Sequence, residues 1–125
     1  MPLDRKALRR EYEDTPRTMG IGVVRNTTNG KVLVLAGQDI ASLLNRHQAQ
    51  LRLGVHRNQA LQGDWQAAGE RAFVFEIVDT LTPKDTPGYD PDPDLSVLEQ
   101  LWLERLNPFA PAGYNPPPKT GARSA

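Results

Sequence analysis

The chain has 125 residues, no cysteine and a formal net charge of zero at pH 7. This length suits one domain with one hydrophobic core, and the lack of cysteine excludes disulfides and thiolate metal sites. No apolar run approaches the roughly 20 residues that a membrane-spanning helix needs, and the charged residues 1–13 lack the apolar middle of a secretion signal. We therefore expect a cytoplasmic protein.

The first elements in chain order are a short charged helix and a hairpin. Residues 3–13 indicate a helix that stops before Pro16. Residues 20–25 and 31–36 are apolar and rich in β-branched side chains, which is typical of strands. The pair Asn29-Gly30 between them supplies the positive φ angles that a tight hairpin turn requires.

Two helices are expected after the hairpin. Asp39 is a good N-cap for a helix that ends at Gly54, and apolar side chains recur in it at helical spacing: Ile40, Leu43, Leu44 and Leu51. A second helix is expected over residues 58–69, which ends at a glycine. Its apolar face consists of Leu61, Trp65 and Ala68.

A third strand and a last helix complete the predicted domain. Residues 72–78 alternate well enough for a strand, and the proline-rich residues 82–93 predict a loop. Asp94 is expected to cap a helix that runs to Leu106. The order of elements predicts an α/β (α+β) fold in which helices flank a small antiparallel three-stranded sheet.

We divide the chain into three parts on this basis. Residues 18–115 form the predicted domain, and residues 1–17 form an N-terminal charged helix or extension. Residues 116–125 form a proline-rich tail that we expect to be disordered.

Charge is distributed unevenly along the neutral chain. Residues 1–63 hold 10 lysines and arginines against 5 aspartates and glutamates, whereas residues 64–125 hold 5 against 10. No acidic residue lies between Asp39 and Asp64, and that window carries Arg46, His47, Arg52, His56 and Arg57. A local basic face suits contact with phosphate, and the competing interpretation is a solvated surface that pairs with the acidic half.

Two polar residues fall on helix faces that are otherwise apolar. Glu99 lies inside the stripe of the last helix, which consists of Leu95, Leu98, Trp102 and Leu106, and a buried carboxylate is costly unless it is paired or bound to a cation. His47 lies in the middle of the buried arc of the helix over residues 39–54, where a structural role competes with a role as a ligand. If both helices pack on one face of the sheet, we hypothesise that Glu99 and His47 form a polar pair at the mouth of a cleft.

The order of these motifs resembles the GIY-YIG nuclease superfamily, which includes homing endonucleases and DNA-repair excision subunits. Residues 20–35, GIGVVRNTTNGKVLVL, resemble its signature, and residues 98–103 resemble its metal-binding helix. Further similarity comes from His47, residues 53–58, Leu61, Gln62, Trp65, Gly69, Phe73 and the closing Gly113-Tyr114-Asn115. The resemblance covers residues 18–115. It implies a nucleic-acid partner, with DNA expected, catalytic roles for Glu99 and His47, and Mg²⁺ or Mn²⁺ held through Glu99.

The chain departs from the family pattern at four positions. The two signature tyrosines fall on Gly22 and Leu33, the signature glycine on Leu35, and the arginine of the first main helix on Leu43. In the family, a tyrosine helps to activate the attacking water, the arginine stabilises charge on the phosphate, and the glutamate holds a divalent ion. Glycine and leucine side chains can neither donate, accept nor carry charge, so we expect little catalysis. We hypothesise that the site has closed into a packed core or an apolar pocket.

Three functions follow from these observations. The leading interpretation is a degenerate domain that binds nucleic acid through Lys31, Arg46, Arg52, His56 and Arg57, with Asn115 in support. The second is an active metal-dependent DNA endonuclease that uses substitutes, drawn from Tyr12, Tyr89, Tyr114, Arg25 and Arg46. The third is a protein-interaction module that uses the acidic residues 85–94 and the prolines of residues 116–118.

Overall fold

The computed structural model describes residues 18–117. The expected helix over residues 3–13 and the tail beyond Pro117 lie outside the described residues. The described elements, in chain order, are β1 (Met19–Asn26), β2 (Val32–Gly37), α2 (Ile40–Leu53), α3 (Gln59–Ala68), a short 3₁₀ turn (Glu70–Ala72), β3 (Phe73–Leu81) and α4 (Asp92–Leu106). Among the described helices, none is long and apolar enough to cross a membrane.

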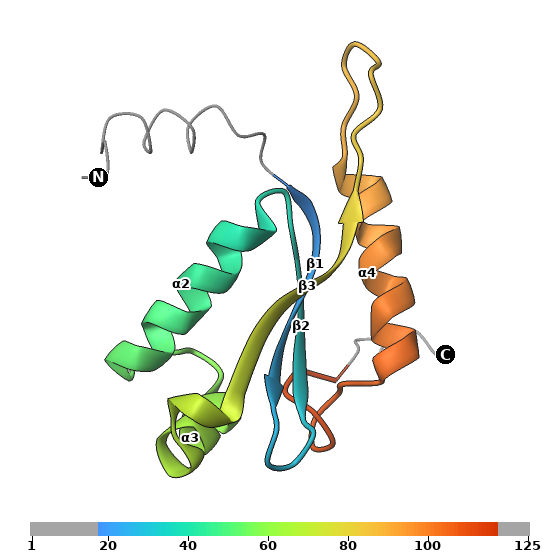
Figure 1. Ribbon diagram of the computed structural model, residues 1–125. Coiled ribbons are helices and arrows are strands. Elements are labelled where there is room, and N and C mark those ends of the chain that lie inside the picture. The colour runs from blue at the N-terminus through green and yellow to red at the C-terminus, as the bar shows by residue number, and fades with distance from the viewer. Residues whose placement is uncertain (1–17, 118–125) are drawn as a thin grey trace, which may run out of the picture.

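The sheet has three antiparallel strands in the order β2-β1-β3. Helix α2 lies on one face and helix α4 on the other (Figure 1). Val23 in the central strand pairs with Val34 on β2 and with Glu76 on β3, and the register with β3 shifts between Ile21 and Gly22. The predicted fold, helices flanking a small antiparallel sheet, is confirmed.

Alternation of side chains along the strands divides the core into two layers. The layer beneath α2 and α3 contains Val24 and Leu33 from the sheet, packed against the helix residues Ile40, Leu44, Leu51, Leu61 and Trp65. The layer beneath α4 contains the intervening sheet residues Ile21, Val23 and Val34, packed against Leu95, Leu98, Trp102 and Leu103. Because the two helices occupy opposite faces, groups on their inner surfaces are separated by the sheet.

The hairpin turn between β1 and β2 differs from the tight Asn-Gly turn expected from the sequence. Of the two residues, only Gly30 has a positive φ, at 78°. The turn is instead organised by Asn26, whose side-chain oxygen accepts hydrogen bonds from the Thr28 amide at 3.0 Å and the Thr28 hydroxyl at 2.7 Å. Its backbone carbonyl accepts from the Gly30 amide at 2.8 Å. The loop between β1 and β2 is thus longer than a two-residue turn, and only one of its residues, Gly30, adopts the left-handed conformation.

The helix starts agree with the sequence in two cases out of three. Asp39 and Asn58 cap α2 and α3 through their side chains, as expected. Helix α4 begins at Asp92, so Asp94 lies within its first turn and is not the cap. Pro93 explains the difference. Backbone amides in the first turn of a helix have no partner within the helix, so a proline, which has no amide hydrogen, is favoured there.

The segment after α4 closes the free side of β2, and we call residues 113–115 the C-terminal clasp. The Asn115 side chain accepts a hydrogen bond from the Val34 amide at 2.8 Å and donates one to the Val34 carbonyl at 3.0 Å. The Tyr114 amide donates to the Val32 carbonyl at 2.9 Å. The clasp thus provides hydrogen-bond partners for backbone groups of β2 that would otherwise pair with a further strand.

The hydroxyl of Tyr114 joins the clasp to the hairpin and to α3. It donates to the Asp64 carboxylate at 2.6 Å and accepts from the Asn26 side-chain amide at 3.0 Å. Both Tyr114 and Asn26 are buried, with exposed fractions of 2% and 1%. Three segments that are distant in the sequence therefore meet at one hydroxyl group.

We expect Tyr114→Phe to lower the free energy of unfolding by roughly 1–3 kcal/mol, because it leaves the buried Asn26 amide without an acceptor. Urea denaturation followed by circular dichroism measures the change. Tyr89→Phe is the matched control, since the Tyr89 hydroxyl bonds to Asp94 at the surface. Equal stability of the wild type and Tyr114→Phe would contradict the role assigned to this hydroxyl.

Candidate functional site

The positions of the missing signature side chains lie under α2. A Cβ atom placed on Gly22 would lie 3.0 Å from side-chain atoms of Ile40 and Leu44, so the helix fills the space above this glycine. Leu33, at the position of the second tyrosine, is only 5% exposed and belongs to the same core layer. A side chain at Gly22 would need the terminal methyl groups of Ile40 and Leu44 to shift, and Leu33 is already enclosed by apolar neighbours.

The other two departures complete an apolar wall. Leu35 and Leu43 are half-buried and pack against the core layer beneath α2. A Leu43 methyl group lies 3.2 Å from the point that a Cβ atom on Gly37 would occupy. At these positions apolar side chains therefore pack against one another, and the replacement of polar site walls stays a prediction.

Glu99 lies on α4, on the other face of the sheet. It is half-buried, and burial raises the pKa of its carboxyl group. Within residues 18–117 it forms no hydrogen bond or ion pair with another side chain. A carboxylate in this state keeps its oxygen atoms available to a ligand.

The proposed pair of Glu99 and His47 is wrong. His47 lies on α2, across the sheet from α4, and its Nδ1 atom is 2.7 Å from Nε2 of His56. The two imidazole rings are 4.9 Å apart between centroids. The sequence placed His47 correctly on an inward arc, but a helical wheel does not reveal on which face of the sheet its helix packs.

The hydrogen bonds of the histidine pair determine where its protons lie. The Asn58 amide donates to Nδ1 of His56 at 3.0 Å, so the proton of neutral His56 is on Nε2. That atom donates to Nδ1 of His47, which leaves the His47 proton on its own Nε2. Burial, His56 and Arg46 lower the pKa of His47 to about 4, and burial also lowers the pKa of His56.

The basic residues named from the sequence fall into two groups. Arg46 and Arg57 are exposed, and neither forms a hydrogen bond or ion pair with another described side chain. Arg52 is held by two hydrogen bonds to Glu70, at 3.0 and 2.7 Å. The Lys31 ammonium lies 5.9 Å from the centre of the Tyr114 ring. Among these named residues, the cations without an acidic partner at α2 and the loop after it are Arg46 and Arg57.

Two residues assigned to nucleic-acid contact form hydrogen bonds within the fold. His56 is 8% exposed and uses both ring nitrogens within the protein. Asn115 is 9% exposed and uses both amide atoms on Val34. Both side chains use their polar atoms within the protein, and their assignment as direct contacts with nucleic acid stays a prediction.

The substitute groups considered for an active nuclease are also engaged. Tyr114 donates to Asp64, and burial followed by this hydrogen bond raises its pKa to about 12. The hydrogen bond from Tyr89 to Asp94 raises the pKa of Tyr89. Arg25 forms an ion pair with Glu76. Tyr12 lies outside the described residues.

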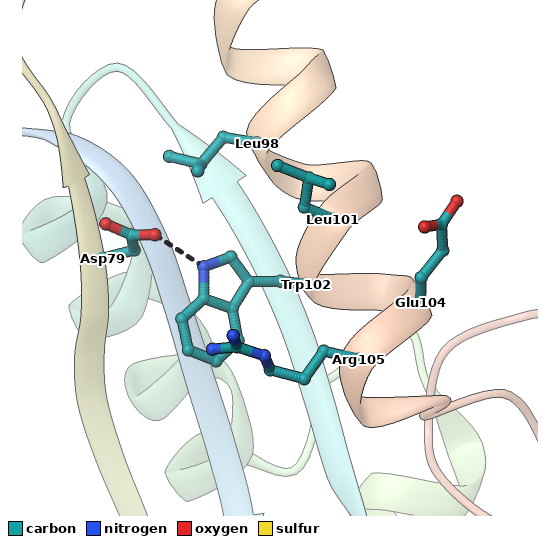
Figure 2. Close-up of a pocket in the computed structure, with 6 residues that line it drawn as sticks. All are labelled: Asp79, Leu98, Leu101, Trp102, Glu104 and Arg105. Atoms are coloured by element: carbon teal, nitrogen blue, oxygen red, sulfur yellow. Dashed lines mark hydrogen bonds between the residues drawn. The ribbon is translucent and has the colours of Figure 1, made fainter.

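A surface pocket that the sequence did not indicate lies beside α4 (Figure 2). Its volume is about 450 Å³, and its lining consists of Asp79, Leu98, Leu101, Trp102, Glu104 and Arg105. The Trp102 indole donates to Asp79 at 2.8 Å, and the Arg105 guanidinium lies 5.0 Å from the indole ring. The sequence assigned Trp102 to the core, and only its spacing from Arg105 hinted at a stacked surface pair.

The donor set for a metal ion is small. Within residues 18–117 no group of three or more histidine, aspartate or glutamate side chains could hold one. Glu99 alone suits Mg²⁺ or Mn²⁺ only in a site completed by water and substrate phosphate, which is a common arrangement for Mg²⁺. The residues present therefore fit such an ion when a phosphate is bound beside it.

The acidic loop considered for protein interaction is tied back to α4. Tyr89 donates to Asp94 at 2.7 Å, and the Lys84 ammonium lies 3.9 Å from the same carboxylate. Of residues 116–118, Pro116 and Pro117 lie in the described part and are exposed. The interpretation as an interaction module stays a prediction.

Comparison with known proteins supports the fold. No protein-family model and no curated protein matches the chain. Two solved structures are similar to it. The catalytic domain of the homing endonuclease I-TevI is 29% identical, with a TM-score of 0.62, and the match covers 80% of this chain and 99% of that domain. A glutamate-to-alanine mutant of the catalytic domain of the intron endonuclease I-TevI is 26% identical, with a TM-score of 0.63 and coverage of 78% and 92%.

We expect the His47 imidazole to titrate near pH 4, and its titration to change in His56→Gln but not in Glu99→Gln. Both histidines have a lower pKa in the folded protein than the ordinary 6.5, so the unfolded chain binds more protons in this range. The free energy of unfolding is therefore retained above pH 6.5 and falls as the pH drops from 6.5 toward 4.

Proton NMR of the imidazoles and urea denaturation at several pH values measure these effects. The variant with both His47→Gln and His56→Gln is the control, and it should lose this part of the pH dependence. A His47 titration that moves in Glu99→Gln would show that the two groups communicate across the sheet, contrary to the geometry.

Proposed function

We propose that this chain, which has a GIY-YIG-like fold, is a nucleic-acid-binding domain that has lost the ability to cut. The observation that carries the proposal is the burial of Leu33 beneath α2, with Gly22 covered by the same helix. A nuclease of this family presents polar side chains from these positions. Here the space that those side chains would occupy is filled by leucine and isoleucine.

The loss of these groups removes most of the chemistry of phosphodiester cleavage. Activation of water by a general base contributes about 10² to 10⁴ in rate, and a donor that stabilises developing charge contributes a similar factor. Leu33 and Leu43 supply neither. The tyrosines within the described residues that could replace them are Tyr89 and Tyr114, whose raised pKa values make them weaker acids than free tyrosine.

The surface that we propose for nucleic acid is the outer side of α2 and the loop after it. Arg46 and Arg57 are exposed there and have no acidic partner among the described residues. Unpaired arginines gain more from a phosphate than arginines that must first leave a carboxylate, such as Arg52. Contacts of this type hold the backbone and carry no sequence information.

DNA is the nucleic acid that we propose, because both similar structures are of an endonuclease that is a homing or intron enzyme. Lys31, at the hairpin, is a further candidate contact because its side chain is only partly buried. The proposal does not need His56 or Asn115, since both side chains are committed to the fold.

An active metal-dependent endonuclease is the second candidate, and one observation favours it. Glu99 is half-buried without a partner among the described side chains, at a position that resembles the metal-binding glutamate of the family. A divalent ion bound there would act as a Lewis acid on the phosphate. The chain's own contribution would be limited to holding that ion, because the apolar wall beneath α2 offers no base.

We expect end-labelled duplex, branched and single-stranded DNA to remain intact after incubation with the full chain and Mg²⁺ or Mn²⁺. A denaturing gel provides the measurement, and Glu99→Ala is the matched control. Cuts made by the wild type that vanish in Glu99→Ala would overturn the proposed loss of cleavage and establish the second candidate. Cuts that persist in Glu99→Ala would instead indicate a contaminating nuclease.

We expect Arg46→Gln combined with Arg57→Gln to weaken binding to duplex DNA about tenfold at low salt, since two phosphate contacts are lost. The slope of log K against log salt should fall in magnitude by about 2, one unit for each contact. Fluorescence anisotropy with a labelled duplex measures both values. Arg105→Gln, on α4, is the control. Binding by the wild type that does not change with salt would contradict the proposal.

A further inference from the structure

Two apolar side chains project from the turn that joins α2 to α3, and we call Leu53 and Val55 the apolar tip. Leu53 is 75% exposed and Val55 is 63% exposed, the two largest values among the large hydrophobic residues of the described chain. The turn lies at the end of α2, away from the strands (Figure 1). Exposure of two neighbouring apolar side chains on a small domain calls for a partner.

The backbone of the tip explains why Val55 stays exposed. Gly54 has a φ of 76°, and its amide donates to the Leu51 carbonyl at 3.1 Å while the Val55 amide donates to the Gln50 carbonyl at 3.0 Å. These two bonds form a Schellman motif, in which the residue after the glycine usually packs on an apolar residue at the position of Gln50. Here that position is polar, so Val55 has no apolar neighbour to cover it.

The turn is also held from the side of α3. The Gln62 side chain accepts from the His56 amide at 2.9 Å and donates to the Leu51 carbonyl at 3.1 Å. The tip is therefore attached to a backbone with several fixed hydrogen bonds. A side chain presented in this way loses little conformational entropy when it binds.

The charged residues around the apolar tip indicate what kind of partner it would bind. Arg46 lies two helical turns before Leu53 on the same side of α2, and Arg57 follows Val55 closely in the chain. The acidic groups nearby are already engaged, since Glu70 accepts from Arg52, the residue before Leu53. Asp64, the next acidic residue in the sequence, accepts from Tyr114. An apolar tip between two unpaired arginines is complementary to an anionic polymer that also offers apolar surface.

The other exposed apolar residues of the chain have different surroundings. Val97, on α4, is 62% exposed, but the first turn of that helix carries Asp92 and Asp94. Leu101 lines the pocket beside Glu104. Acidic side chains thus accompany both positions, and the basic Arg105 in the pocket lies beside Glu104, whereas the tip lies between two arginines without an acidic partner among the described residues.

We infer that the apolar tip inserts against unstacked bases of DNA while Arg46 and Arg57 hold the flanking phosphates. Aliphatic side chains are used in this way by proteins that wedge open a base step and kink the duplex. The inference rests on the proposed function and refines it. It assigns the domain a preference for DNA in which stacking is already weakened, such as a duplex with a mismatch, because there the cost of unstacking is lower.

The test uses the full chain and two DNA duplexes that carry 2-aminopurine, one fully paired and one with a mismatch beside the probe. We expect the wild type to bind the mismatched duplex about tenfold more tightly, since part of the cost of unstacking is already met, and to raise the probe fluorescence. Leu53→Ser combined with Val55→Ser should lose the preference and the fluorescence change. Binding to the paired duplex should persist through the arginines.

Val97→Ser is the matched control, because Val97 has nearly the same exposed fraction as Val55. It should behave as the wild type in both assays. Val55→Thr, which keeps the branched shape, gives a second variant with little risk to folding, and it should reduce the preference partly. Thermal melting of each variant checks that the fold is retained.

Three outcomes would overturn the inference in different ways. If the wild type binds both duplexes equally and the tip variants match it, the wedge is absent, while the proposed binding function stands. If the wild type binds neither duplex, the proposed function fails together with the inference. Recovery of a protein that binds the wild type but not the tip variants, without any DNA binding, would assign the tip to a protein partner instead.

Discussion

The side-chain amide of Asn115 bonds to both backbone groups of Val34, and much of the fold depends on this pairing. It brings the end of the chain back to β2 after α4 has crossed the sheet. Gly113 makes the return possible, because a Cβ atom there would lie 2.2 Å from the Pro108 carbonyl oxygen. Tyr114 is then directed into the core layer beneath α2, where its hydroxyl reaches Asp64 and Asn26.

The same pairing holds Tyr114 in the core layer beneath α2. Tyr114 packs in the layer that contains Leu33 and Leu44, so the aromatic ring and the leucines form one continuous apolar body. A polar site at this place would need water, whereas a packed interior excludes it. The binding that we propose therefore uses surfaces outside the layer, chiefly the exposed side of α2 and its turn.

The sequence was sufficient for the elements and the fold, because hydrophobic periodicity, Asp39, Asn58 and the hairpin are local signals. It was also sufficient to place leucines at the signature positions. It was not sufficient for contacts that depend on three-dimensional arrangement. His47 and His56 are nine residues apart, and nothing in their spacing predicts that their ring nitrogens meet. Asn115 was predicted as a site residue, because its neighbours in the sequence do not reveal that its side chain bonds to the backbone of Val34.

The sheet has two edges of different character. On β2 the clasp occupies Val34, and the prolines that follow, Pro116 and Pro117, have no amide to extend a ladder. The other edge of the sheet is β3, and within residues 18–117 β3 pairs with no strand other than β1. Unpaired backbone groups are thus presented to an outside strand on the β3 side of the sheet. Residues 113–115 act as a cover for the other edge, because without them the backbone groups of Val32 and Val34 would be open to an outside strand as well.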